Sequence, residues 1–202
     1  MPHPVPSPNS VSLNPHVVEL LKTYPTDGTH GYHWINGFDG VTRDLIYQGE
    51  VIAKAETQRR TYCCGLTLEV YLLACERYAR LRGAKSYRLD ELTPGGVRKL
   101  KSDWFVATGK RGGPVDALIP RGLGVKIPVI EEALPGDFIQ LWRESGSGHS
   151  VIFLGLEDGG FRYWSTQTST KGIGERSEKF NVVKRDELYI ARAFLPRPES
   201  GK

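Results

Sequence analysis

The chain has 202 residues and a mixed composition, with 39% hydrophobic and 25% charged residues. These values exclude an intrinsically disordered chain and predict a globular one that buries a core without disulfide bonds. The net charge of +4 is small, and no basic run is interleaved with aromatic residues, so nucleic acid is not an expected partner.

Residues 1–15 are rich in Pro, Ser and Asn and predict an extended arm. They lack a basic segment followed by an apolar one, which is the pattern of a secretory signal. No later stretch is apolar enough to span a membrane. We therefore expect a cytoplasmic protein without a membrane span, with export by another route left open, and a single domain over residues 16–202.

The next elements are short. Apolar residues at helical spacing predict a helix over 17–21, with Asn14 as its N-cap and Pro15 in the first turn. Residues 25–40 are dense in Gly, Asp and His and predict a loop. Alternation over 41–55 around a Gln48-Gly49 turn predicts a β-hairpin.

The clearest helix is predicted over residues 63–81. Leu66, Val70 and Leu73 follow helical steps and define an apolar face, and Gly83 is a stop signal. Because this helix is apolar over much of its surface, we expect it at the centre of the fold. A second helix is expected around 89–100, offset by Pro94-Gly95-Gly96, and a helical turn around 115–119.

From Pro135 onward the period changes from that of a helix to that of a strand. Strands are predicted at 138–143, 150–156, 161–167 and 188–194, the first three as an antiparallel meander. Helices early and strands late predict an α+β fold, with one central helix packed on a mostly antiparallel sheet.

Two adjacent cysteines open the predicted central helix, and Cys75 lies further along it. Cys63 and Cys64 are too close to form a disulfide without backbone distortion, so we expect free thiols. A helix N-terminus lowers the pKa of a thiol, and its unpaired N–H groups can stabilise an oxyanion. From this turn alone, a nucleophile and a pair of small buried hydrophobic side chains remain equally open interpretations.

A histidine at the start of a later strand favours the interpretation of a cysteine as a nucleophile. His149 follows a glycine-rich approach, and an imidazole within hydrogen-bond distance of a thiol can take its proton and later return it. A third group should accept the other ring N–H. Gln167 on the next strand can do so through its amide oxygen, and Ser165 is the competing residue.

These residues lie in two motifs that occur in the same order in a known family. Tyr62-Cys63-Cys64-Gly65-Leu66-Thr67 resembles the nucleophile motif Asp-Cys-Ser-Gly-Leu/Phe-Val of the NlpC family of bacterial cell-wall peptidases, a branch of the papain-like cysteine hydrolases. The later motif, Pro-Gly-Asp-Leu and then His-Val-Gly-Ile-Tyr-Leu-Gly, is similar to residues 135–138 and 149–155. The resemblance covers roughly residues 60–80 and 130–175, and it aligns the nucleophile with Cys63.

The resemblance implies a papain-like, NlpC-type core and a thiol-dependent hydrolase that needs no cofactor. Its implied substrate is a peptide amide of peptidoglycan or of a related bacterial molecule. The N-terminal extension over residues 1–55 and an insert at about 84–130 have no counterpart in a minimal domain. The open alternatives are a non-catalytic binding module on the same fold and a thiol acyltransferase or deamidase.

Three further residues are candidates for the oxyanion or substrate site. Gln58 stands upstream of the cysteines like the oxyanion glutamine of papain-like enzymes, a phasing that suits Cys64 as the nucleophile instead. Tyr62 replaces the acidic residue of the family motif. Trp34 belongs to an aromatic loop that could cover one side of a cleft. The histidines and aspartates near this loop lack the spacing of a metal site, so no metal is expected.

Overall fold

The computed structural model describes residues 10–35, 37–89 and 92–196. In this part of the chain there are four α-helices: α1 (Asn14–Leu21), α2 (Cys63–Leu81), α3 (Pro94–Trp104) and α4 (Pro114–Leu118). The strands are β1 (Ser10–Ser12), β2 (Leu45–Tyr47), β3 (Glu50–Ala53), β4 (Gly124–Ile127), β5 (Phe138–Trp142), β6 (Gly148–Glu157), β7 (Gly160–Gln167), β8 (Gly172–Lys179) and β9 (Tyr189–Pro196).

Seven of the strands form one sheet in which all pairings are antiparallel. Its order is β1-β9-β5-β6-β7-β8, and β4 also pairs with β9. The meander of β5, β6 and β7 is confirmed, as is the coarse α+β architecture. Strands β4 and β8 are not predicted from the sequence. In β8 a run of exposed polar residues hides the strand period, because backbone pairing with β7 holds this strand rather than burial of both faces.

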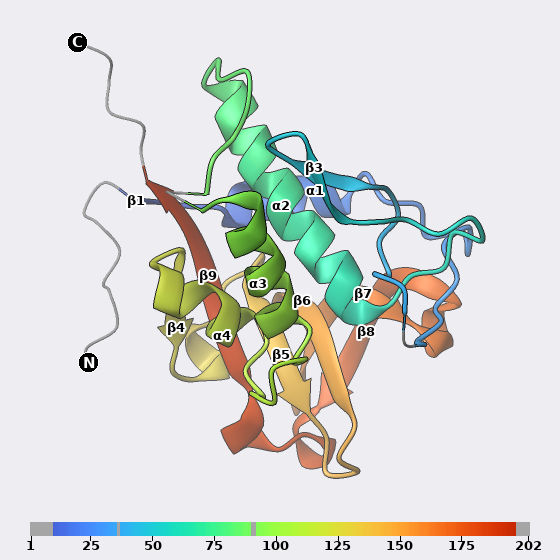
Figure 1. Cartoon of the computed structure of the whole chain (residues 1–202). Helices are drawn as coiled ribbons and strands as arrows, with labels where there is room; N and C mark the ends of the chain where they lie inside the picture. The colour runs from blue at the N-terminus through green and yellow to red at the C-terminus, as the bar shows by residue number, and fades with distance from the viewer. Residues whose placement is uncertain (1–9, 36, 90–91, 197–202) are drawn as a thin grey trace.

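The central helix α2 crosses one face of the sheet (Figure 1). Leu66 and Val70 on this helix are fully buried and belong to a core that includes Ile152 of β6 and Trp164 of β7. A second core occupies the other face of the sheet, built from alternate residues of the same strands. The predicted central position of the helix is therefore correct, although Leu73 of the predicted apolar face is only half-buried.

The start of the chain differs from the sequence prediction. Residues 1–9 of the predicted arm lie outside the described residues, whereas β1 pairs with β9 and α1 already begins at Asn14. The prediction that Asn14 caps this helix is wrong, because Leu13 is the N-cap. The Asn14 amide instead donates to Asp137 Oδ1 at 2.7 Å and to the Pro135 carbonyl at 3.0 Å. The Asn14 oxygen, which a cap would use to accept a helix N–H, instead accepts from the Ser12 hydroxyl at 3.1 Å.

Two other predictions can be compared directly. Strands β2 and β3 form the expected hairpin around Gln48-Gly49. The helix expected around 89–100 begins only at Pro94, where the Thr93 side chain caps it by accepting from the Gly96 N–H at 3.2 Å. Thr93 and Pro94 together are a strong helix start, and this local signal outweighs the apolar spacing before it.

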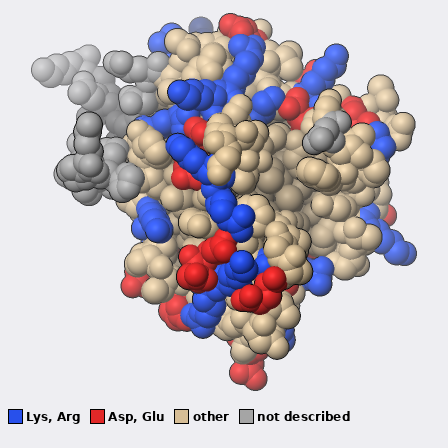
Figure 2. Space-filling model, turned by 60° about the horizontal axis from the view of Figure 1, so that its bottom comes forward, with Lys and Arg blue, Asp and Glu red and all other residues tan. Residues whose placement is uncertain are grey.

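Charged residues of both signs are interspersed over the face shown in Figure 2. Ion pairs link many of them, for example Arg111 with Glu187. Within the described ranges, none of the helices has both the length and the hydropathy to cross a lipid bilayer.

Candidate active site

The two adjacent cysteines occupy the first turn of α2. Tyr62 is the N-cap in an extended conformation, and the first intrahelical bond runs from the Leu66 N–H to the Tyr62 carbonyl at 3.0 Å. Cys63 is 7% exposed, Cys64 is half-buried, and their sulfur atoms lie 3.9 Å apart. The backbone N–H groups of a first helical turn have no partner within the helix, so this turn can also receive negative charge.

Glycines allow the loop before the site to pack directly against this turn. A Cβ on Gly65 would lie 2.0 Å from the Asp39 carbonyl oxygen, so the backbone of residues 39–40 occupies the space of a side chain. Gly40 has a positive φ of 67°, and a Cβ there would lie 2.2 Å from the Tyr62 ring. The Tyr62 hydroxyl donates to the Phe38 carbonyl at 3.0 Å. Backbone contact and ring packing thus fix the residue that precedes Cys63.

A buried hydroxyl joins this turn to the sheet. Thr67 Oγ1 donates to the Cys63 carbonyl at 2.9 Å, accepts from Trp104 Nε1 at 3.1 Å and lies 2.8 Å from Ser150 Oγ. These contacts connect α2, α3 and β6 at one point. Because a fully bonded polar group in a core favours a single arrangement, Thr67 sets the position of the first turn relative to β6.

The imidazole of His149 lies at the start of β6, next to Ser150. Its ring is buried and makes an edge contact with Tyr163, with ring centroids 5.7 Å apart. His149 Nε2 lies 3.4 Å from Gln167 Oε1 at the end of β7. The Gln167 amide nitrogen donates to Thr170 Oγ1 at 2.6 Å, which turns the amide oxygen toward the ring. With Gln167 as acceptor the ring hydrogen lies on Nε2, so Nδ1 is free to accept a proton.

The surroundings of Cys63 stabilise a thiolate. A hydrogen bond from the Cys64 thiol is the largest effect that lowers the pKa of Cys63, followed by the charge of His149 and a hydrogen bond to it. The Ser150 backbone N–H adds to this, and together these groups outweigh burial and hold the pKa well below that of an ordinary thiol. The same hydrogen bond and burial raise the pKa of Cys64. Burial raises the pKa of Cys75. Of the three thiols, Cys63 is therefore the one whose surroundings favour the thiolate.

Four other residues were predicted for the site, and the structure gives them other positions or roles. Ser165 donates to the Ser150 carbonyl at 2.7 Å, so it braces the backbone of β6 rather than the His149 ring. Gln58 is exposed, and Trp34 is 63% exposed in its loop. Tyr62 is a packed residue below the turn, with its hydroxyl bonded to backbone. The structure brings together Cys63, Cys64, His149 and Gln167 from the predicted set.

Two nearby residues are missing from the sequence prediction. Tyr32 is half-buried and pairs with Thr61 in a short parallel bridge. Burial, followed by the charges of Cys63 and Cys64, raises its pKa to about 12. Thr170 orients Gln167, as described above. A tyrosine in a loop and a threonine in a polar turn carry no spacing signal, so no pattern in the sequence could have identified them.

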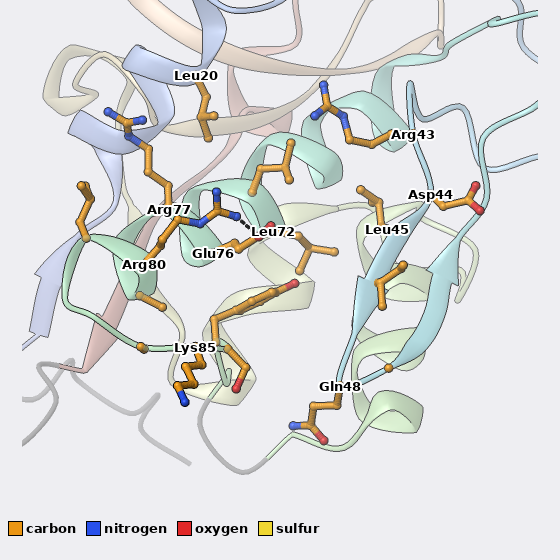
Figure 3. Close-up of a pocket in the computed structure, with 18 residues that line it drawn as sticks. Leu20, Arg43, Asp44, Leu45, Gln48, Leu72, Glu76, Arg77, Arg80 and Lys85 are labelled. Carbon is orange, nitrogen blue, oxygen red and sulfur yellow. Dashed lines mark hydrogen bonds and ion pairs between the residues drawn. The ribbon is translucent and has the colours of Figure 1, made fainter.

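A separate hollow of about 900 Å³ lies away from the thiols, between the β2–β3 hairpin and the C-terminal half of α2 (Figure 3). Its walls combine apolar residues such as Leu45 and Leu72 with Arg43 and Arg77. Neither Cys63 nor His149 lines it. This hollow therefore lies at the C-terminal end of α2, whereas the candidate active site lies at its N-terminal end.

The part of the chain that the structure describes contains no cluster of three or more His, Cys, Asp or Glu side chains suited to a metal ion. The predicted loop histidine His30 instead lies with Nδ1 3.1 Å from the Arg59 carbonyl. Comparison of the chain with protein-family models, with curated proteins and with solved structures finds no match.

Proposed function

We propose that this protein is a thiol-dependent hydrolase of the papain-like, NlpC type, which cleaves an amide bond through Cys63. The observation that carries the proposal is the convergence at one helix N-terminus of a stabilised thiol, a buried imidazole and an oriented amide. The thiol and the imidazole come from residues more than eighty positions apart in the sequence, and the polar contacts of Thr67 join their two elements. Such a proton-sharing arrangement is the general requirement for a cysteine nucleophile.

Each residue then has a defined role. The Cys63 thiolate attacks the carbonyl carbon of the amide, and the backbone N–H of Cys63 or Cys64 receives the resulting oxyanion. Protonated His149 gives its proton to the departing amine, which leaves an acyl group on the Cys63 sulfur. His149 then removes a proton from water, the water attacks the acyl carbon, and the thiolate leaves. Gln167 holds the ring hydrogen on Nε2 throughout, so that Nδ1 faces the reaction.

The substrate class rests on the motif resemblance. Its two motifs are those of enzymes that act on peptide amides of bacterial cell walls, so we propose a peptide amide of peptidoglycan or of a related bacterial molecule. Apart from the hydrolytic water, the chemistry described uses protein groups only. A panel of peptidoglycan stem peptides, analysed by mass spectrometry for new amine and carboxyl ends, tests both the reaction and the substrate. Ammonia release or amine incorporation without cleavage would instead identify a deamidase or an acyltransferase.

The reactivity of the thiol can be measured without knowing the substrate. Iodoacetamide should label Cys63 fastest, and its rate should reach a plateau well below about pH 8.5, the ordinary pKa of a cysteine. A lowered pKa means that the thiolate is lost only when the pH falls through that lower value, so reactivity persists in mild acid. In Cys64→Ala the profile should move to higher pH, because the largest stabilising contact is absent.

Labelling confined to Cys75 in the folded protein would contradict the proposal. Cys75 is fully buried, and we expect it to react only after unfolding in denaturant, which provides an internal control.

A pair of variants distinguishes the two candidates for the third group. Gln167→Ala is expected to lower kcat/KM by about 10²-fold, because a ring that turns away from the thiol by a small distance loses the reaction geometry. Ser165→Ala removes a backbone contact of β6 and should cost less activity than Gln167→Ala. The pH profile of kcat/KM should change shape only in Gln167→Ala. The reverse order of effects would assign the orienting role to Ser165.

A further inference from the structure

We propose that Cys63 and Cys64 form a reversible oxidation site, in which a hydroperoxide oxidises Cys63 and Cys64 then closes a disulfide with it. As a means of regulating the enzyme this rests on the proposed function, because the disulfide would remove the nucleophile. As chemistry of two thiols it is independent of any hydrolysis and can be measured separately.

Proximity and position support the pair. The two sulfur atoms lie 3.9 Å apart and in contact, and Cys64 is half-buried rather than enclosed. When Cys63 is a thiolate it carries no hydrogen, so Cys64 is then the donor in this contact. Thiols that sense oxidants are stabilised as thiolates and lie next to a resolving cysteine. Cys75 cannot be the resolving cysteine, because twelve helical positions separate it from Cys63 by about 18 Å.

The two steps balance. The Cys63 thiolate attacks one oxygen of the hydroperoxide, so the O–O bond breaks, sulfenic acid forms on Cys63, and the peroxide leaves as alcohol or water after taking up a proton. The Cys64 sulfur then attacks the sulfenic sulfur. The S–O bond breaks, the S–S bond forms, and the thiol proton leaves with the hydroxyl group as water. In sum, the dithiol loses two hydrogen atoms and the peroxide is reduced.

The geometry of the product makes it readily reducible. Neighbouring Cα atoms across a trans peptide are about 3.8 Å apart, which is shorter than the usual span of a disulfide. The ring can close only if the peptide unit between Cys63 and Cys64 departs from helical geometry. This unit includes the Cys63 carbonyl, which accepts from Thr67 Oγ1 at 2.9 Å, so closing the ring also strains or breaks that bond. A strained disulfide is a labile one, as expected for a protective and reversible modification.

The test uses the Cys75→Ala protein, so that only the two adjacent thiols remain. Trypsin releases residues 61–77 as one peptide, which contains both. After treatment with equimolar hydrogen peroxide, we expect the mass of this peptide to fall by two hydrogen atoms. The peptide should then no longer be alkylated by iodoacetamide. Dithiothreitol should restore both thiols, and with them any amide-cleaving activity.

Cys64→Ser in the same background is the matched control. Without a resolving thiol, we expect a sulfenic acid on Cys63 that dimedone traps, and then a sulfinic acid that dithiothreitol does not reverse. If the protein with both cysteines accumulates the dimedone adduct or sulfinic acid as fast as this control, the proposal is overturned. If the disulfide forms in a protein that cleaves no amide, the oxidation site is supported and the hydrolase proposal is contradicted. If the protein cleaves an amide but forms no disulfide, the hydrolase is supported and the oxidation site is contradicted.

Discussion

Replacing Cys63 with Ala is expected to abolish amide hydrolysis. Loss of the nucleophile from a catalytic unit of this kind costs on the order of 10⁶ in kcat, since the other members have nothing to activate. His149→Ala should have a loss of the same order, and the double variant should be little worse than either single one, because the two residues act together. Initial rates on the stem peptide that the wild type cleaves best provide the measurement.

Cys75→Ala is the control for removal of a cysteine from α2. Its thiol is fully buried in the core and lies about 18 Å along the helix from Cys63, so activity should stay close to that of the wild type. Cleavage retained in Cys63→Ala would transfer the nucleophile to Cys64 or end the hydrolase proposal. The Cys64→Ala variant then decides between these two outcomes.

Replacing Gly65 with Ala is expected to destabilise the protein by about 3 kcal/mol, the upper part of the range for overpacked cores. The added methyl group would lie 2.0 Å from the Asp39 carbonyl oxygen and 2.7 Å from the Gly40 carbonyl carbon. These are backbone atoms, so the strain is relieved only if the loop moves away from the helix. Urea unfolding measures the loss, and the labelling rate of Cys63 should fall as the turn is displaced.

Gly95→Ala is the matched control, because Gly95 lies in the first turn of α3 as Gly65 does in α2. The nearest atom to its added Cβ is Thr93 Oγ1 at 3.8 Å, an ordinary contact. Alanine has the higher helix propensity, so the stability should equal or exceed that of the wild type by up to about 1 kcal/mol. Equal urea midpoints for the two variants would contradict the packing explanation for Gly65.

The sequence was sufficient for features set by local pattern. The apolar spacing of α2, the Gln48-Gly49 turn and the apolar runs of β5 to β7 are each visible within a short stretch of sequence. Strand β8 could not be found in this way, because its exposed polar residues follow no period. Asn14 was misplaced as a cap because its real partner, Asp137, lies 123 positions away.

The same distinction holds at the candidate active site. The meeting of Cys63 with His149 could be anticipated because each begins an element with a strong local signal, and Gln167 follows from the register of the next strand. Gln58 was predicted from its position before the cysteines and Trp34 from its aromatic loop, and the structure leaves both exposed. Thr170 and Thr67 act only through contacts across the fold, so no local pattern marks them.

The pairing of β1 with β9 has a practical consequence. Ser10 lies opposite Pro196, so the first and last described residues emerge side by side, and Figure 1 has them on the other flank of the molecule from the start of α2. The described part of the chain therefore leaves the fold on the flank away from the thiols, which favours either terminus as the place to attach an affinity tag or a solid support. Immobilised protein should then still act on a polymeric form of the proposed substrate.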